Sequence, residues 1–243
     1  MKTVAIIPCY NADPFCEGVI QDILPYVDDI VLVNDGSTDK THEILERFST
    51  HATHVYYISF GENQGKGFAL LAGMRYALER LSFDVLITLD GDGQHTHTMI
   101  EPIRKKLEKG ADFVIGMRKF SKMPLKSRVA NTCISFLLKF CSKHAPYDTQ
   151  SGLRGFSKKF VQRICEEIEG GRYEMEFRCI LLALKHQIKI VECVVPTIYI
   201  NKNRHSHFRV VRDTFRVLMV FLSYWKQGGC ILKKLQKWGI FIA

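Results

Sequence analysis

Short aliphatic runs alternate with amphipathic stretches along the first half of the chain, and this order limits the possible folds more than any other feature. Five runs have the length and the branched aliphatic composition of buried strands, at residues 4–7, 30–33, 55–58, 85–89 and 113–115. Helical spacing of apolar residues fills the intervals, at about residues 15–26, 40–50, 66–81 and 98–109. This alternation predicts an α/β fold, with a mostly parallel sheet flanked by helices on both faces.

The rhythm changes after residue 117, where a basic segment begins. We predict helices at about 124–142 and 174–186, a loop at 144–156, and two strands at 188–195 and 197–200 separated by Pro196. No linker rich in Pro and Gly divides this part of the chain from the first. We therefore expect one domain over residues 1–205, with halves at 1–117 and 118–205, and a separate helical segment at 206–243.

Residues 201–243 carry most of the net charge. Nine Lys and Arg residues stand there against a single acid, Asp213, which gives +8 of the +9 carried by the whole chain. The longest aliphatic run, 217–222, is far too short to cross a bilayer. We predict C-terminal amphipathic helices, and two interpretations stay open for them. An interfacial membrane helix is favoured for 226–242, whose lysines lie off an apolar stripe, and a helix packed on the domain suits 209–224.

The overall composition, 47% hydrophobic and 24% charged, is that of an ordinary globular protein. The eight cysteines show no CxxC pairing, and the N-terminal run has the pattern of a strand instead of a signal peptide. These features predict reduced thiols in the cytoplasm. Together with the basic C-terminal segment, they lead us to expect a cytoplasmic protein that is peripheral at the inner face of the membrane. No motif accompanies the basic tail that would indicate a nucleic-acid partner.

Polar motifs follow three of the predicted strands directly. Pro8, Tyr10 and Asn11 come after the first strand, Asp35 comes after the second, and Asp90 comes after the fourth. Ligands of open α/β sheets bind at the carboxyl ends of the strands. The sequence therefore predicts a binding site where these three motifs meet.

The motif LDGDGQH contains the strongest candidate for a metal site. Asp90 and Asp92 repel each other unless a cation neutralises them, and a divalent ion with hard oxygen ligands fits Asp90, Asp92 and Gln94. A calcium loop does not fit, because His95 stands where that loop needs Gly and a strand precedes it. A polar turn without a ligand is the alternative. We expect Mg²⁺ or Mn²⁺ here.

The stretch GENQGKGFA, residues 61–69, resembles a phosphate-binding P-loop but is one residue short, and Gly67 stands where Ser or Thr would be needed. Two interpretations remain. The glycines either present backbone amides to an anion at the start of a helix or form a tight strand-to-helix turn, with Asn63 and Lys66 as its polar residues.

Taken together, these motifs resemble those of the family 2 inverting glycosyltransferases of GT-A fold, specifically the branch similar to dolichol-phosphate mannosyltransferases. The resemblance covers about residues 1–210. It rests on the motifs described above, which occur in the family's order and spacing, and continues in the second half with Gly116-Met-Arg118, Asp148-x-x-Ser-Gly-x-Arg154 and Tyr173-Glu-Met-Glu176. It implies a Rossmann-like GT-A domain with a nucleotide-sugar half, 1–117, and an acceptor half, 118–205.

The resemblance also implies roles for individual residues. The nucleotide sugar would contact Pro8, Tyr10, Asn11, Val33, Asp35, Asn63, Lys66, Asp90, Gly91, Arg204 and His207. The metal ligands would be Asp90, Asp92 and Gln94. The phosphate of a lipid acceptor would meet Arg118, Arg128, Thr132, Ser151 and Arg154. Catalysis would depend on Asp90, Asp92, Arg118 and Glu176.

The acceptor determines whether a general base is needed. A sugar hydroxyl must lose a proton, and Glu174 or Glu176 is available for that task. A phosphate monoester arrives largely ionised and needs arginines to position it. Arg128 and Thr132 lie four residues apart on one predicted helix face, which is either an acceptor contact or a solvated basic face.

We therefore expect transfer of a hexose from a nucleotide diphosphate sugar, of the GDP-mannose or UDP-glucose type, to dolichyl or undecaprenyl phosphate at a membrane surface. Two alternatives stay open, a transferase with a sugar-hydroxyl acceptor in cell-surface polysaccharide synthesis and a non-catalytic nucleotide-sugar-binding module. A partner subunit that anchors the protein in the membrane is a further possible requirement.

Overall fold

The computed structural model describes residues 1–118, 125–142, 145–196 and 210–226. A seven-stranded sheet has the order β3-β2-β1-β4-β6-β5-β7. The strands are β1 (Thr3–Cys9), β2 (Asp29–Asn34), β3 (Val55–Ser59), β4 (Val85–Thr88), β5 (Phe113–Met117), β6 (Arg154–Ser157) and β7 (Ile190–Val194). Neighbouring strands pair in parallel except at β6, which is antiparallel to both β4 and β5. The predicted α/β class and mostly parallel sheet are confirmed.

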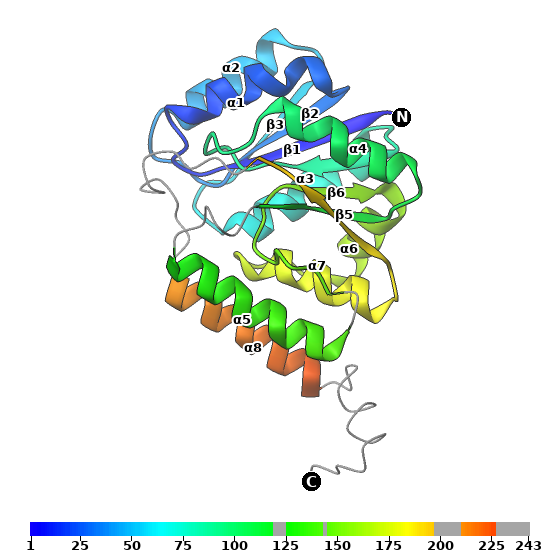
Figure 1. The fold of residues 1–243 in the computed structure, drawn as a ribbon. Coiled ribbons are helices and arrows are strands. Elements are labelled where there is room, and N and C mark those ends of the chain that lie inside the picture. Colours follow the sequence, from blue (N-terminus) through cyan, green and yellow to red (C-terminus); the bar gives the residue numbers. More distant parts are fainter. Residues whose placement is uncertain (119–124, 143–144, 197–209, 227–243) are drawn as a thin grey trace, which may run out of the picture.

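Helices cover both faces of the sheet (Figure 1). They are α1 (Phe15–Ile23), α2 (Thr41–His51), α3 (Lys66–Arg80), α4 (Ile100–Glu108), α5 (Leu125–Cys141), α6 (Lys158–Glu167), α7 (Glu174–Lys185) and α8 (Val210–Lys226). One face carries α1, α2 and α4, and the other carries α3, α6 and α7. Helices α5 and α8 lie side by side beyond α7 and form an outer layer.

Alternating side chains on the central strand divide the core in two. Val4 and Ile6 of β1 pack into the cluster on the α3 face, whereas Ala5 and Ile7 pack into the cluster on the α1 face. Side chains of a strand point to opposite faces in turn, so a strand covered on both sides is apolar throughout. All seven residues of β1 are buried, which explains why its sequence shows a continuous aliphatic run.

Two elements differ from the sequence prediction. The end of the predicted loop forms β6, and the following helix α6 was not predicted. β6 has only four residues, including Arg154 and Gly155, and its position is fixed by hydrogen bonding to β4 and β5. α6 begins at a Ser157 cap, whose Oγ accepts from the Phe160 amide at 3.2 Å. Of the predicted strand pair near Pro196, β7 is present, and residues 197–200 lie outside the described part of the chain.

The predicted packed helix at 209–224 corresponds to α8, which contacts α5 and α7. The interfacial helix predicted at 226–242 lies, apart from its first residue, outside the described residues. Among the residues that the structure describes, none of the helices combines the length and the apolar character needed to cross a bilayer.

Candidate active site

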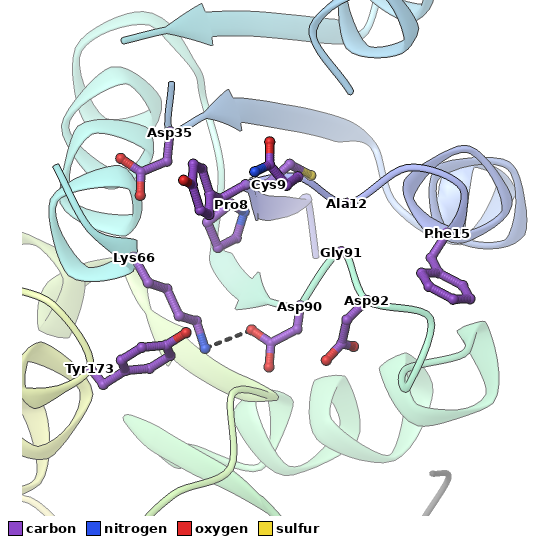
Figure 2. A pocket seen from close by; sticks show the side chains of 12 residues that line it. Pro8, Cys9, Ala12, Phe15, Asp35, Lys66, Asp90, Gly91, Asp92 and Tyr173 are labelled. Atoms are coloured by element: carbon purple, nitrogen blue, oxygen red, sulfur yellow. Dashed lines mark ion pairs between the residues drawn. The ribbon is translucent and has the colours of Figure 1, made fainter. Parts of the chain in front are cut away.

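A pocket opens at the carboxyl ends of β1, β2 and β4, where the sequence predicts a site (Figure 2). The end of β1, the loop after it and the first residue of α1 contribute half of the lining residues, Asp35 follows β2, and Asp90, Gly91 and Asp92 follow β4. The lining is Pro8, Cys9, Tyr10, Asn11, Ala12, Phe15, Asp35, Lys66, Asp90, Gly91, Asp92 and Tyr173. Cys9, Ala12, Phe15 and Tyr173 were not predicted as site residues.

Asp90 is held between positive and polar groups. Its Oδ1 lies 2.6 Å from Lys66 Nζ, and its Oδ2 lies 3.6 Å from His95 Nε2. Burial raises the pKa of Asp90, but the charge of Lys66 and the hydrogen bond from His95 outweigh burial, so the pKa lies well below its ordinary value. Asp90 is therefore ionised over the physiological pH range.

Asp92 has the opposite balance. Burial, followed by the negative charge of Asp90, raises the pKa of Asp92 above its ordinary value. Gln94 donates to this carboxylate through its backbone amide at 3.1 Å and through its side-chain amide at 2.9 Å. Gln94 thus orients Asp92, with its amide nitrogen turned toward the carboxylate. Its predicted role as a third metal ligand requires the side-chain oxygen instead.

The two carboxylates fit a divalent cation that takes its other ligands from a substrate. Among the described residues, no three His, Cys, Asp or Glu side chains form a group that holds a metal ion by itself. Mg²⁺ is commonly bound by one or two carboxylates together with substrate phosphates. Asp90 and Asp92 match that donor set, because both are acids on one loop and the charge of Asp90 disfavours the ionised form of Asp92.

Asp35 shapes the loop that precedes α3. Its carboxylate is buried and accepts hydrogen bonds from the backbone amides of Gln64, at 2.8 Å, and Gly65, at 3.0 Å, and from Asn63 Nδ2, at 3.0 Å. Burial raises the pKa of Asp35 in spite of these bonds. If Asp35 contacts a nucleoside as predicted, it must do so with a carboxylate that already accepts hydrogen bonds from this turn.

The remaining predicted nucleotide residues differ in position. Pro8 and Tyr10 line the pocket, and Asn11 joins two loops, because its Oδ1 accepts from the Thr38 amide at 2.8 Å. The side chain of Val33 is fully buried in the core on the α3 face, so only its backbone could meet a ligand. Arg204 and His207 lie outside the described residues.

The glycines at the start of α3 allow a close approach to the loop before α7. A Cβ at Gly67 would lie 2.5 Å from the carbonyl oxygens of Gly171 and Arg172. Gly65 has a φ of +116°, a conformation that favours glycine. The glycine-rich stretch thus forms a tight turn, and this turn points the side chain of Lys66 into the pocket (Figure 2).

Lys66 also reaches Glu176, the predicted catalytic acid of the second half. The Lys66 Nζ lies 3.1 Å from Glu176 Oε1, and Arg154 Nε lies 3.9 Å from the same oxygen. Burial lowers the pKa of Lys66, but the charges of Asp90 and Glu176 outweigh burial and raise it above its ordinary value. Lys66 is therefore a fixed positive charge between two acids.

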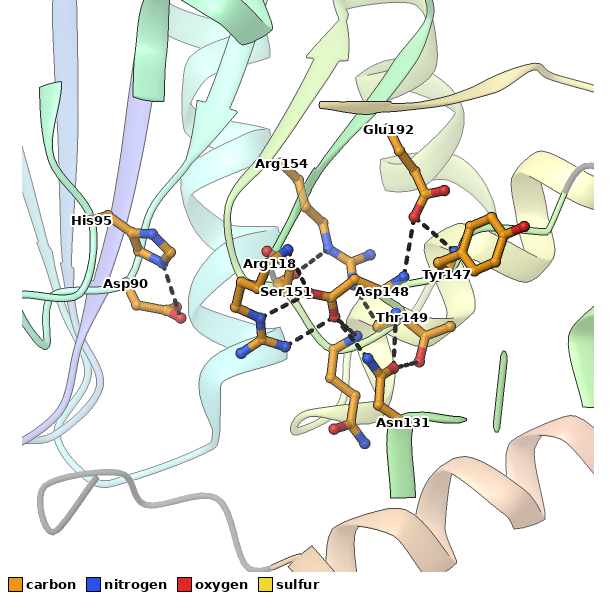
Figure 3. Close-up of polar contacts among 11 residues, drawn as sticks. Asp90, His95, Arg118, Asn131, Tyr147, Asp148, Thr149, Ser151, Arg154 and Glu192 are labelled. Carbon is orange, nitrogen blue, oxygen red and sulfur yellow. Dashed lines mark hydrogen bonds and ion pairs between the residues drawn. The ribbon is translucent and has the colours of Figure 1, made fainter. Parts of the chain in front are cut away.

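On the acceptor side, Arg118 is held by a buried acid that the sequence prediction did not assign a role. Its Nε and Nη2 lie 2.8 and 2.9 Å from the two oxygens of Asp148, which is fully buried (Figure 3). Asp148 also accepts from Asn131 of α5, at 3.1 Å. Glu192 of β7 accepts from the backbone amides of Tyr147 and Asp148. This network orients the Arg118 guanidinium.

Arg154 and Ser151, which are predicted to contact an acceptor phosphate, are both buried. Arg154 is only 1% exposed, and it donates to the backbone carbonyls of Ser151, Thr149 and Glu176. Ser151 is buried as well. The guanidinium of Arg154 is occupied with the chain around it, and its predicted contact with an acceptor phosphate stays a prediction.

Arg128 and Thr132 lie on one face of α5, as predicted, and both are exposed. Asn131 of the same helix is buried against Asp148. The loop that contains Asp148 reaches back to the metal loop, because a Cβ at Gly152 would lie 2.3 Å from Asp90 Oδ2. The acid of the donor side and the loop that holds Arg118 are therefore in direct contact.

The sequence profile of glycosyl transferase family 2 matches residues 4–165, which include the three strand-end motifs and the loop from Asp148 to Arg154. The chain belongs to glycosyl transferase family 2. A family relative from Methanococcus voltae, a UDP-N-acetylglucosamine–dolichyl-phosphate N-acetylglucosaminyltransferase, is 31% identical over 216 residues, which are 80% of this chain and 84% of that protein. An undecaprenyl-phosphate mannosyltransferase from Micrococcus luteus is 32% identical over 122 residues, which are 49% of each chain.

Solved structures of similar fold include a glucosyl-3-phosphoglycerate synthase from Mycobacterium tuberculosis, crystallised with Mn²⁺, UDP and glucosyl-3-phosphoglycerate. It has a TM-score of 0.68 at 17% identity, over 90% of this chain and 79% of that one. This similarity confirms the predicted GT-A fold of the family 2 chain.

Proposed function

We propose that this family 2 glycosyltransferase moves a hexose from a nucleotide diphosphate sugar, of the GDP-mannose or UDP-glucose type, to a polyprenyl phosphate, with inversion at the anomeric carbon. The observation that carries the proposal is the contact between Asp90 and Gly152. It brings the acid of the donor pocket against the loop whose Asp148 orients Arg118. The two named relatives, a dolichyl-phosphate and an undecaprenyl-phosphate transferase, support the acceptor class.

The residues of the pocket divide the chemistry between them. A divalent cation, Mg²⁺ or Mn²⁺, held by Asp90 and Asp92 would stabilise the departing diphosphate as a Lewis acid. Lys66 supplies a further positive charge beside Asp90. Arg118, oriented by Asp148, would add the positive charge of a residue type that recognises phosphate.

A phosphate acceptor suits the state of Glu176. A sugar hydroxyl needs a carboxylate to take its proton. Glu176 is buried and pairs with Lys66, and Arg154 lies beside it. A phosphate monoester, with a second pKa of about 6, needs no strong base. Because Glu176 is already paired with Lys66, it is poorly placed to take a proton from a sugar hydroxyl, and an acceptor that arrives ionised fits this site better.

Incubation of the purified chain with labelled GDP-mannose or UDP-glucose, Mn²⁺ and a polyprenyl phosphate should give a sugar product that extracts into organic solvent and is labile to mild acid. Parallel reactions with saccharide acceptors serve as the comparison. Label that enters saccharides alone would reject the lipid acceptor. The sugar-hydroxyl alternative further predicts that Glu176→Gln abolishes transfer while nucleotide binding survives.

The outer layer of helices α5 and α8 offers a surface that could contact the membrane in which such a lipid lies. Exposed apolar side chains lie along α5 and α8, namely Val129, Phe136, Leu137, Phe215, Leu218 and Met219. We infer that they form one face of the outer layer. This face is called the α5–α8 face below. Arg128 and Thr132 are exposed on the same helix as three of these residues. We propose that the α5–α8 face lies on the cytoplasmic face of the membrane, as a peripheral contact aided by the basic charge of residues 201–243. The partner subunit stays a prediction.

A further inference from the structure

Lys66 bridges two acids at the centre of the pocket. Its ammonium group lies 2.6 Å from Asp90 and 3.1 Å from Glu176, and its side chain is only 16% exposed. The positive charge thus lies against the carboxylate that the proposed function assigns to a metal ion (Figure 2). An ammonium group and a divalent cation repel each other, so tight metal binding at Asp90 requires Lys66 to be drawn away.

The protein alone offers a metal ion few ligands. Among the described residues, no third acidic, His or Cys side chain joins Asp90 and Asp92 to form a metal-binding group. The missing ligands must come from elsewhere, and the phosphate oxygens of a nucleotide are suitable donors. The same oxygens attract an ammonium group, which carries three hydrogen-bond donors. A diphosphate can therefore satisfy the metal and Lys66 together.

Glu176 keeps Lys66 in the pocket while this exchange takes place. The carboxylate is 7% exposed, and Arg154 donates to its backbone carbonyl and lies near its side chain. Lys66 can leave Asp90 and retain its contact with Glu176. Its position at the start of α3, after the turn that Asp35 holds, fixes the backbone from which the side chain swings.

We propose that Lys66 is the resident counter-ion of Asp90, and that a nucleotide diphosphate draws it off and so opens Asp90 to the metal ion. Metal and nucleotide then bind cooperatively, and the coupling is the same in both directions, because free energies of binding are linked. Lys66 acts as a positioning residue in this exchange, with Glu176 as its second partner. The inference rests on the proposed metal-dependent use of a nucleotide sugar.

The test measures Mn²⁺ binding without any acceptor or turnover, by electron paramagnetic resonance of free Mn²⁺ in titrations of the full chain. For the wild type, whichever of GDP and UDP binds should tighten Mn²⁺ binding at least about tenfold. Lys66→Met should bind Mn²⁺ alone several-fold more tightly than the wild type and should lose most of the tightening by nucleotide. Lys66→Arg, which keeps the charge, should retain the coupling.

Lys185→Met is the matched control, because Lys185 is a lysine in a 2.7 Å ion pair with Glu167, outside the pocket. It should behave as the wild type. Asp90→Asn should weaken Mn²⁺ binding with and without nucleotide. Lys66→Gln replaces the Met variant if circular dichroism shows that the latter is unfolded.

The inference is overturned if removal of the Lys66 charge leaves both the affinity for Mn²⁺ alone and the effect of the nucleotide unchanged. That result would leave the proposed function intact as long as nucleotides still bind. Failure of both GDP and UDP to bind the wild type would reject the proposed function instead. The arm with Mn²⁺ alone would still decide whether Lys66 competes with the metal.

Discussion

The two sides of the pocket are built on different physical principles. On the donor side, Asp35, Asp90 and Asp92 stand on loops that follow parallel strands, and the topology of the sheet brings them together. On the acceptor side, Arg118 also follows a strand, β5, but its guanidinium is held by Asp148, a residue that Asn131 and Glu192 hold from two other elements. The backbone places the donor residues, whereas a buried network of charges places the acceptor arginine.

This difference predicts which property each substitution changes. A donor acid faces a ligand, so its loss should impair binding and turnover more than folding. An acceptor-side acid is enclosed by its partners, so its loss should impair folding as well as turnover. Four substitutions test or refine this contrast.

The largest effect is expected for Asp90→Asn. Loss of the metal-binding charge should lower kcat/KM by about a thousandfold or more, since a metal ion supplies several kcal/mol of transition-state stabilisation. Asp84→Asn is the matched control, because Asp84 precedes the same strand, β4, at the opposite end, where it accepts from the Lys2 amide. Initial rates of labelled-sugar transfer measure the effect. Retention of a tenth of the wild-type rate by Asp90→Asn would contradict it.

Asp148→Ala should produce the largest loss of stability. It removes the acceptor of Arg118 and Asn131 from a fully buried position, and breaking such a pair costs about 3–5 kcal/mol. Urea denaturation gives the free energy of unfolding. Asp92→Asn is the donor-side comparison and should not lower stability, because the charged form of Asp92, whose pKa burial raises, is already disfavoured. Equal destabilisation by both substitutions would contradict the expected difference between the donor-side and the acceptor-side acids.

A double substitution on the outer layer tests whether the α5–α8 face binds the membrane that holds the lipid acceptor. Phe136→Ser with Phe215→Ser removes two of the most exposed apolar side chains, at 72% and 60% exposure. Each aromatic ring that enters the membrane contributes about 1.5–3 kcal/mol, so binding to anionic vesicles should fall by about tenfold or more. Co-sedimentation with vesicles measures it. Tyr26→Ser, at an exposed aromatic residue in the short helix Leu24–Tyr26 that follows α1, serves as control and should have no effect.

The smallest effect is expected at Glu167, a surface counterpart of Asp148. Its carboxylate has three basic partners, Arg163, Lys185 and His186, but it lies at the surface. The hydrogen bond from Lys185 is the largest of the contacts that lower the pKa of Glu167, to about 2. Glu167→Gln should cost at most about 1 kcal/mol, because solvent screens such a pair.

The pH dependence of that cost has a defined sign. A carboxylate whose pKa is lower in the folded state stabilises the fold above its unfolded pKa, about 4.3. The stability difference between wild type and Glu167→Gln should therefore be present at neutral pH. It should disappear as the pH falls from the unfolded pKa to the folded pKa of about 2. Urea denaturation at several pH values measures it. A difference that grows on acidification would contradict the assignment.

The same contrast determines what could be read from the sequence. The five strands of the first part and the polar residues that follow them were predictable, because aliphatic runs and strand ends are local signals. The expected burial fails at β3, an edge strand in which only Val55 is buried. β6 was missed, since four residues including Arg154 and Gly155 carry no strand pattern without their neighbours. The presence of Asp148 in a motif was evident, but its function as the anchor of Arg118 was not.

Pairings across the fold explain that limit. Asp148 meets Asn131 and Glu192, which lie 17 and 44 residues away in the chain, and no periodicity encodes such partners. The same applies to Lys66 and Glu176, 110 residues apart. Arg154 shows the same limit, because its contacts with the backbone carbonyls of Ser151 and Thr149 could not be predicted from its place in a motif.

The antiparallel direction of β6 has a consequence for how such a protein can change its acceptor. Ile115 near the end of β5 pairs with Arg154 at the start of β6, so the segment between them leaves and re-enters the sheet at adjacent points. Because the two ends of this segment lie side by side in the sheet, the segment can be lengthened, shortened or replaced as a unit while β5 and β6 keep their register. Grafting residues 118–153 between relatives would then transplant acceptor preference and leave the nucleotide preference of the recipient unchanged.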